Sequence, residues 1–144
     1  MSSQADTRSE LERRCSAIEE AYEFMLAYAA QGLSGDVGSH SGGQLREFLQ
    51  RTVAALSGVA GVFAAFVTQA GVEPAEQYHA FLAVLDRDAR DTLAAVQLVL
   101  VQPSISSQLI DNLNASIHIR ALLTDLFLID EILKGQATPG KTSG

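Results

Sequence analysis

The chain has 144 residues, of which 47 % are apolar and 19 % are charged, and its formal net charge is −7. This length suffices for one domain with a substantial core. The negative charge argues against binding to nucleic acid or to anionic membranes, because both require a basic surface. The charged fraction is below the average of globular domains, which favours a further surface that is buried by self-association.

Cysteine use and the start of the chain bear on the compartment. Cys15 is the only cysteine, so no internal disulfide can form, and residues 1–10 contain no apolar segment of the signal-peptide type. Both features predict a reducing, cytoplasmic setting. Cys15 lies among apolar residues at helical spacing without a basic neighbour on that stripe, which predicts a buried thiol and not a nucleophile.

Residues 1–8 are polar, and we expect them to be disordered. The first helix is predicted over 9–31, with Ser9 as its N-cap and Gly32 as its stop. Apolar residues at spacings of three and four predict its buried stripe, namely Leu11, Cys15, Ile18, Tyr22, Met25 and Ala29.

The segment 32–43 contains five glycines and three serines. Such a composition leaves few side chains to pack and predicts a flexible connector. The alternative is a phosphate-binding loop, in which Gly42 and Gly43 would present backbone amides at the start of a helix. No lysine is nearby and no strand precedes the loop, so the connector is the preferred interpretation.

The stretch 52–72 contains no Asp, Glu, Lys, Arg or His and completes a helix predicted over 44–70. A helix that is apolar on all sides must be covered on all sides. A glycine inside a helix costs about 1 kcal/mol relative to alanine, and close approach of another helix is the usual compensation. We therefore predict a contact with a second copy of the chain in a symmetric dimer, formed by Ala54, Ser57, Gly58, Gly61 and Ala65. Tight packing within one bundle is the alternative.

A third helix is predicted over 73–101, with Pro74 in its first turn and Asp86 paired with Arg90 on its outer side. Its inner side is predicted to comprise Tyr78, Phe81, Leu82, Leu85, Ala89, Val96 and Val99.

A fourth helix is predicted over 104–134, because Pro103 breaks the chain and Ser104 can serve as the N-cap. Four helices with mostly short links predict an all-α, antiparallel four-helix bundle over 9–134, followed by a disordered tail over 135–144. A polar stripe runs down one side of the fourth helix and comprises Asp111, Asn114, His118 and Asp125.

The tail matches the Walker A pattern at Gly135, Gly140, Lys141 and Thr142. A phosphate-binding loop requires a strand before it and a helix after it. Here a helix is predicted before the pattern and the sequence stops two residues after it. We therefore predict no nucleotide site.

Glu76 and His79 are the candidate metal ligands, because E-x-x-H occurs on two helices of di-iron bundles, with a Glu on each of the other two. The stretch 52–72 supplies no such ligand. Counted from the turn at 102–103, His79 and His118 lie about 12 Å apart along the axis, too far to share a metal. We predict solvent-facing histidines and no metal or cofactor.

The same counting places Glu19 and Glu20 near the level of Arg87 and His118. An inward-facing set of this kind would be an acid–base site, whereas an outward-facing set would form surface ion pairs. These residues lie off the apolar stripes, so the surface interpretation is preferred.

Together, these patterns predict a non-enzymatic helical protein that self-associates and acts as an adaptor, assembly factor or scaffold. One alternative is a helical bundle that binds a metal or a small apolar ligand between its helices, either as a binding protein or as an enzyme. A membrane-associated protein is a further alternative, because 52–72 has about the length of a membrane span. Seven of its positions are Gly, Ser, Thr or Gln, and its flanks are not rich in Lys or Arg.

Overall fold

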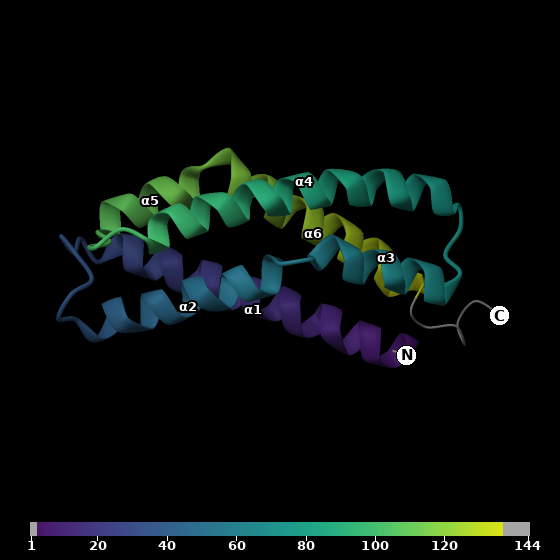
Figure 1. The fold of residues 1–144 in the computed structure, drawn as a ribbon, viewed down its shortest axis with the longest axis horizontal. Coiled ribbons are helices and arrows are strands. Elements are labelled where there is room, and N and C mark those ends of the chain that lie inside the picture. The colour runs from purple at the N-terminus through teal and green to yellow at the C-terminus, as the bar shows by residue number, and fades with distance from the viewer. Residues whose placement is uncertain (1–2, 137–144) are drawn as a thin grey trace.

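The protein is all-helical in a computed structural model, which describes residues 3–136. The described residues form no strand, and the helices lie side by side along one long axis (Figure 1). Six helices replace the four that the sequence predicted, because two of the predicted helices are each broken in two. They are α1 (Gln4–Ala30), α2 (His40–Leu56), α3 (Val59–Ala70), α4 (Ala75–Leu100), α5 (Ser107–Ala115) and α6 (Ile117–Gln136).

The first break lies at Ser57 and Gly58, where α2 and α3 meet at an angle of 43°. Gly58 adopts a φ of 73°, in the left-handed region that glycine reaches at little cost. The break leaves main-chain carbonyls at the end of α2 without helical partners. Arg14 of α1 supplies donors, since its Nη1 donates to the carbonyl oxygens of Ala55 at 3.1 Å and of Ser57 at 2.6 Å.

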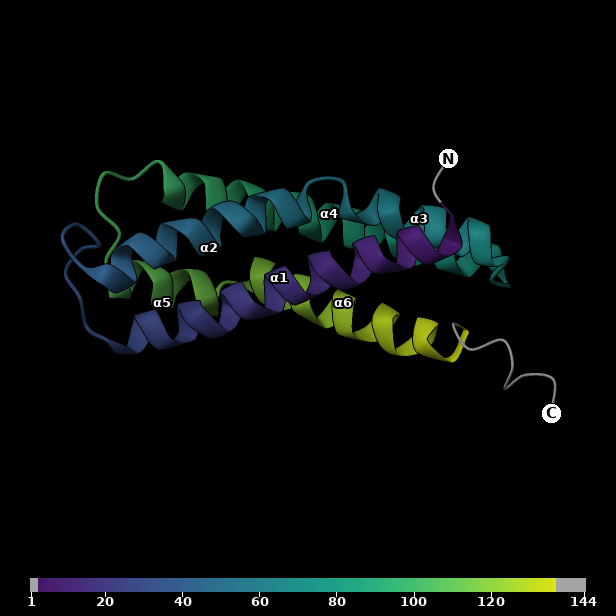
Figure 2. The same cartoon turned by 90° about the horizontal axis from the view of Figure 1, so that it is seen from below.

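The second break lies at Ser116, which is extended with a ψ of 147°. Its hydroxyl lies 3.5 Å from the main-chain N–H of Ile119, in the position of an N-cap for α6. The break redirects the chain. α5 packs against α1, whereas α6 packs against α4 and diverges from α1 (Figure 2).

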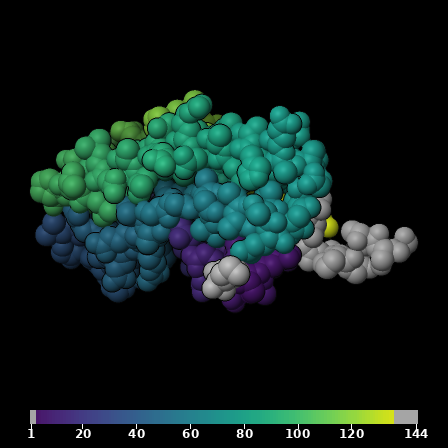
Figure 3. Space-filling view, turned by 45° about the vertical axis from the view of Figure 1, so that its right-hand side comes forward, coloured from purple at the N-terminus to yellow at the C-terminus, as the bar shows by residue number. Residues whose placement is uncertain are grey.

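The uncharged stretch 52–72 is not enclosed on every side within the chain. Phe63, Phe66 and Val67 are buried against the neighbouring helices. The opposite flank is exposed at Ala54 and Gly61. At this end of the molecule, α3 and the start of α4 lie over the amino-terminal half of α1 (Figure 3). The stretch therefore has a bare flank, and this chain alone does not meet the expectation that protein covers it on all sides.

The start of α1 also differs from the prediction. Ser3 caps the helix, because its hydroxyl accepts a hydrogen bond from the Asp6 N–H at 3.1 Å, and the Asp6 carboxylate lies 3.5 Å from the Ser3 N–H. This capping box satisfies two free amides at the helix end. Ser9, the predicted N-cap, therefore lies inside α1, and most of the segment 1–8 is helical.

The glycine-rich segment is anchored by one buried carboxylate, contrary to the prediction of a flexible connector. Asp36 is only 6 % exposed. It accepts hydrogen bonds from Arg46 Nε at 2.5 Å and from the Ile105 N–H at 2.6 Å. Arg46 also donates to the carbonyls of Leu100 and Gln102, at 3.0 and 2.9 Å. Asp36 and Arg46 thus join the α1–α2 and α4–α5 connections.

A second set of buried hydrogen bonds closes the same end. The Tyr28 hydroxyl donates to the Ile105 carbonyl at 2.7 Å, and the Ser107 hydroxyl donates to the Tyr28 carbonyl at 2.7 Å. The Leu33 N–H donates to the Ser107 hydroxyl at 2.9 Å. We call Tyr28, Asp36, Arg46 and Ser107 the end clasp.

Candidate functional site

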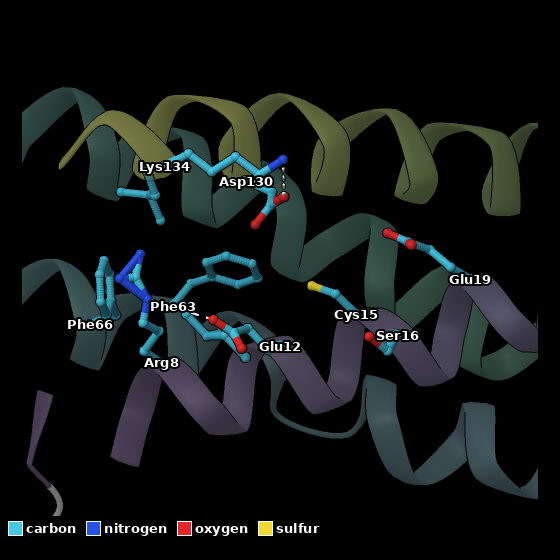
Figure 4. Close-up of a pocket in the computed structure, with 11 residues that line it drawn as sticks. Arg8, Glu12, Cys15, Ser16, Glu19, Phe63, Phe66, Asp130 and Lys134 are labelled. Carbon is cyan, nitrogen blue, oxygen red and sulfur yellow. Dashed lines mark ion pairs between the residues drawn. The ribbon is translucent and has the colours of Figure 1, made fainter. Parts of the chain in front are cut away.

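A groove opens where α6 diverges from α1. It encloses about 340 Å³ and is lined by α1, α3 and α6 (Figure 4). Its floor is apolar, with Leu11, Phe63, Phe66 and Leu133, and its walls are polar or charged. We call it the α1–α6 groove. The side chains of its polar and charged walls are Arg8, Glu12, Ser16, Glu19, Asp130 and Lys134.

Ion pairs border the α1–α6 groove on both sides. Arg8 Nε lies 3.6 Å from Glu12 Oε1 on α1, and Lys134 Nζ lies 3.8 Å from Asp130 Oδ2 on α6. The Arg8 guanidinium also lies over the Phe66 ring, 5.9 Å from its centre. Such a groove can bury an apolar group under a charged rim.

Cys15 projects into the α1–α6 groove (Figure 4). Burial raises the pKa of its thiol to about 12, with smaller contributions from the negative charges of Asp130 and Glu19. A thiol with this pKa stays protonated at neutral pH, whereas the thiolate is the reactive form. This agrees with the expectation that Cys15 is not a nucleophile.

The candidate metal ligands Glu76 and His79 are both exposed on α4. Across residues 3–136, no group of three or more His, Cys, Asp and Glu side chains is placed to hold a metal ion. The structure therefore does not bring Glu76 and His79 together with a third ligand.

The four residues that were predicted to lie near one level of the bundle are on the surface. Glu19, Glu20, Arg87 and His118 are all exposed, as predicted, but the predicted ion pairs among these four described residues do not form. The main-chain carbonyl of His118 accepts a hydrogen bond from the Thr92 hydroxyl at 2.9 Å. His118 therefore lies beside Thr92, more than one turn along α4 from the level predicted for it.

Two members of the predicted polar stripe on 104–134 are buried, which the sequence analysis missed. Asn114 of α5 donates from Nδ2 to the Met25 carbonyl at 3.1 Å. Asp125 of α6 is 8 % exposed. One signal was available: Asp125 precedes Ile129 by four residues and Ile132 by seven, so it lies on an apolar stripe of its helix.

Asp125 faces another carboxyl group, that of Asp88 on α4. No N–H or O–H donor among the described residues reaches Asp125 Oδ2. The Asp88 carboxyl can therefore satisfy this oxygen only when one of the two groups carries a proton. Burial raises the pKa of Asp125 to about 7, and the neighbouring Asp88 adds to the shift. Asp88 and Asp125 thus form a carboxyl pair that no cation in the described part of the chain compensates.

The predicted contact residues lie along the bare flank of α2 and α3. Ala54, Ser57, Gly58 and Gly61 are exposed, and Ala65 is half-buried. A shallow depression of about 690 Å³ runs between this part of α3 and α1. It is lined by Asp6, Thr7, Glu10, Arg13, Gly58, Gly61, Val62, Ala65 and Gln69.

The Walker A pattern is only partly described. Gly135 lies within α6, whereas Gly140, Lys141 and Thr142 lie outside the described residues.

Among the described helices, none is by itself long and apolar enough to cross a membrane. α2 and α3 meet that requirement only as a pair, and the pair is bent by 43°. Comparison with protein-family models, with curated proteins and with solved structures finds no match. Any functional conclusion therefore rests on the residues and the geometry of this chain.

Proposed function

We propose that this chain is a non-enzymatic helical protein that self-associates and acts through its surfaces, as an adaptor, assembly factor or scaffold. In this proposal α2 and α3 count as one bent helix, and so do α5 and α6. One chain then forms a four-helix bundle. The observation that carries the proposal is the bare flank of the uncharged stretch, and above all Gly61. The low charged fraction of the chain supports it as well.

Gly61 lies within α3, where a glycine costs about 1 kcal/mol relative to alanine. A Cβ atom placed on Gly61 would meet no other atom within 4 Å. The fold of one chain therefore gives no reason for a glycine at this position. Gly58 differs, because the left-handed φ of 73° at the break accounts for it. Close approach of a helix from a second copy would account for Gly61.

The test is the oligomeric state by sedimentation velocity over a range of concentrations. We expect the wild-type chain to dimerise and Gly61→Gln to be monomeric, because a long side chain blocks close approach. Gly43→Gln is the matched control, since Gly43 is also an exposed helical glycine with open space around it. A wild-type chain that is monomeric at every concentration would refute self-association.

A second candidate function is the binding of a small apolar ligand, and the α1–α6 groove favours it. Native mass spectrometry of freshly purified protein tests this candidate. We expect a stoichiometric bound molecule that is lost in Cys15→Phe, which fills the groove, and kept in Cys15→Ser. Protein without any bound molecule would leave the surface-mediated role as the only proposal.

A further inference from the structure

The outer surface between α4 and α6 carries two facing apolar stripes. Tyr78, Phe81 and Val84 come from α4, and Leu128 and Ile132 come from α6. A groove of about 320 Å³ runs between the stripes. Val84, Leu128 and Ile132 are 41 %, 49 % and 43 % exposed. We call these five residues the α4–α6 face.

The carboxyl pair closes one end of the α4–α6 face. On α4, Asp88 follows Val84 by four residues and continues its stripe. On α6, Asp125 precedes Leu128 by three residues and starts its stripe. The carboxyl groups of these two residues interact, so both stripes end at the same level.

This carboxyl pair is unusual because no cation pairs with it among residues 3–136. Asp125 is 8 % exposed and its Oδ2 has no donor among the described residues. The charged group that acts on it is Asp88, which is also acidic. Burying an anion without a cation is costly. A cationic side chain placed over the pair would remove that cost.

We propose that the α4–α6 face docks an amphipathic helix of a partner protein, with apolar side chains in the groove and a Lys or Arg on the half-buried Asp88, beside Asp125. Helix-in-groove contacts use anchors at i, i+4 and i+7. From Tyr78 to Asp88 the face spans ten residues of α4, or about 15 Å. The partner stripe is therefore about three turns long. The inference rests on the proposed role as an adaptor and is independent of self-association.

A second copy of this chain does not fit the same face. In a two-fold contact each copy would present the stripes of α4 and α6. The charged residues on these stripes are Asp88 and Asp125, so a copy would bring acids and no cation. Because the described stripes offer acids and no cation, we assign the complementary charge to a different protein.

The test uses the full chain and stapled helical peptides. Each peptide carries Leu at i, i+4 and i+7 and a Lys one turn beyond the stripe, at either end in two versions to cover both orientations. We expect saturable NMR shift changes at Phe81, Val84, Leu128 and Ile132 with one version. Replacing the Lys by Glu should weaken binding roughly tenfold or more, because a charge pair is lost and a repulsion is added.

Variants of the chain locate the contact. Leu128→Asp and Asp125→Asn should each weaken binding of the Lys peptide roughly tenfold. Leu98→Asp, at another exposed leucine, should not, because Leu98 lies away from the face on α4. Circular dichroism checks that each variant is folded, and Ile132→Glu replaces Leu128→Asp if that variant unfolds.

Three outcomes would overturn the inference. They are no binding by either peptide version, binding that is equal for the Lys and Glu peptides, and shift changes outside α4 and α6. Loss of a wild-type dimer in Leu128→Asp would assign the face to a second copy instead. A wild-type chain that is monomeric would remove the self-association proposal and leave these peptide results fully interpretable.

Discussion

Two buried aspartates, one in the end clasp and one between α4 and α6, differ in whether neighbouring groups compensate their charge. Asp36, in the end clasp, is 6 % exposed, and Asp125, between α4 and α6, is 8 % exposed. Hydrogen bonds from Arg46 and from the Ile105 N–H lower the pKa of Asp36. Burial and Asp88 raise the pKa of Asp125 to about 7. Burial by itself raises the pKa of both carboxyl groups. The hydrogen bonds from Arg46 and Ile105 outweigh it at Asp36, whereas Asp88 adds to it at Asp125.

The two regions also differ in how their helices are joined. At the end clasp, α1, α2, α4 and α5 share hydrogen bonds that satisfy the connecting segments. At the opposite end α6 diverges from α1, and the α1–α6 groove lies between them (Figure 2). Saturated polar contacts identify the part of the fold that holds the structure together. The α1–α6 groove and the unsatisfied Asp125 Oδ2 lie outside the end clasp.

The largest effect is expected from removing the cation of the end clasp. Arg46→Met leaves the buried Asp36 carboxylate without its ion pair, which should lower the free energy of unfolding by about 3–5 kcal/mol. Urea denaturation at pH 7 measures this loss. Arg90→Met is the matched control, because the exposed pair of Arg90 with Asp86 at 2.8 Å should be worth less than about 1 kcal/mol. Equal effects of the two variants would contradict the distinction between the regions.

A substitution at Asp125 is expected to stabilise the fold, in contrast to the substitution at Arg46. Its folded-state pKa of about 7 lies above the ordinary value of 3.8, so the folded state holds a proton that the unfolded state releases. The Asp125 carboxyl group therefore makes its whole contribution to the free energy of unfolding below pH 3.8. This contribution declines as the pH rises to about 7. Asp125→Asn should remove this decline and raise the free energy of unfolding by about 1–3 kcal/mol at pH 8.

Urea denaturation of Asp125→Asn and wild type between pH 4 and pH 8 checks this prediction. The two proteins should converge towards pH 4, because the Asp125 carboxyl is then protonated in the wild type. If Asp125→Asn raises the free energy of unfolding equally at pH 4 and at pH 8, ionisation of Asp125 is not the cause.

A smaller effect is expected at the break between α2 and α3. Arg14→Met removes the donors to the carbonyls of Ala55 and Ser57, and should destabilise the fold by about 1–2 kcal/mol. Arg13→Met is the control, because Arg13 pairs with Glu10 at the surface. Thermal unfolding of the two variants compares them. If Arg14→Met is no worse than the control, water satisfies these carbonyls equally well.

The smallest effects are expected at the two neighbouring glycines. Gly61→Ala should stabilise the isolated chain by about 0.5–1 kcal/mol, because its Cβ meets no other atom. Gly58→Ala should destabilise it by about 1 kcal/mol, because an alanine is strained at the left-handed φ of this position. Urea denaturation at a concentration below dimerisation measures both. Shifts of the same sign would contradict the different reasons given for these glycines.

Much of the fold was predictable because helical periodicity is local. The inner side of the third predicted helix proved buried at Leu82, Leu85, Ala89, Val96 and Val99. Tyr78 and Phe81, predicted on the same side, are only half-buried. The Asp86–Arg90 pair forms as predicted, at 2.8 Å. His79 and His118 are exposed, as predicted. Each prediction depends on residues within about one turn of each other.

The breaks and the buried acids were not predictable in the same way. Nothing within a few residues of Gly58 or Ser116 requires a helix to stop there, since neither position has a nearby proline. The α2 break is accommodated by Arg14, which is 43 residues from Ser57 in sequence. The burial of Asp125 and the anchoring of Asp36 depend on α4 and on Arg46. These contacts between residues that are distant in sequence form only when the helices pack.

The sequence by itself determined that this chain is helical and which side of most helices is apolar, and it placed helix ends near Ala30, Ala70 and Leu100. Those properties follow from the propensity and spacing of neighbouring residues. The tertiary structure alone decided that α6 leaves α1, that a glycine-rich segment is held by Asp36, and that Asp125 is buried beside Asp88. These outcomes depend on which distant helix covers each face, because burial and charge pairing are properties of the packed chain.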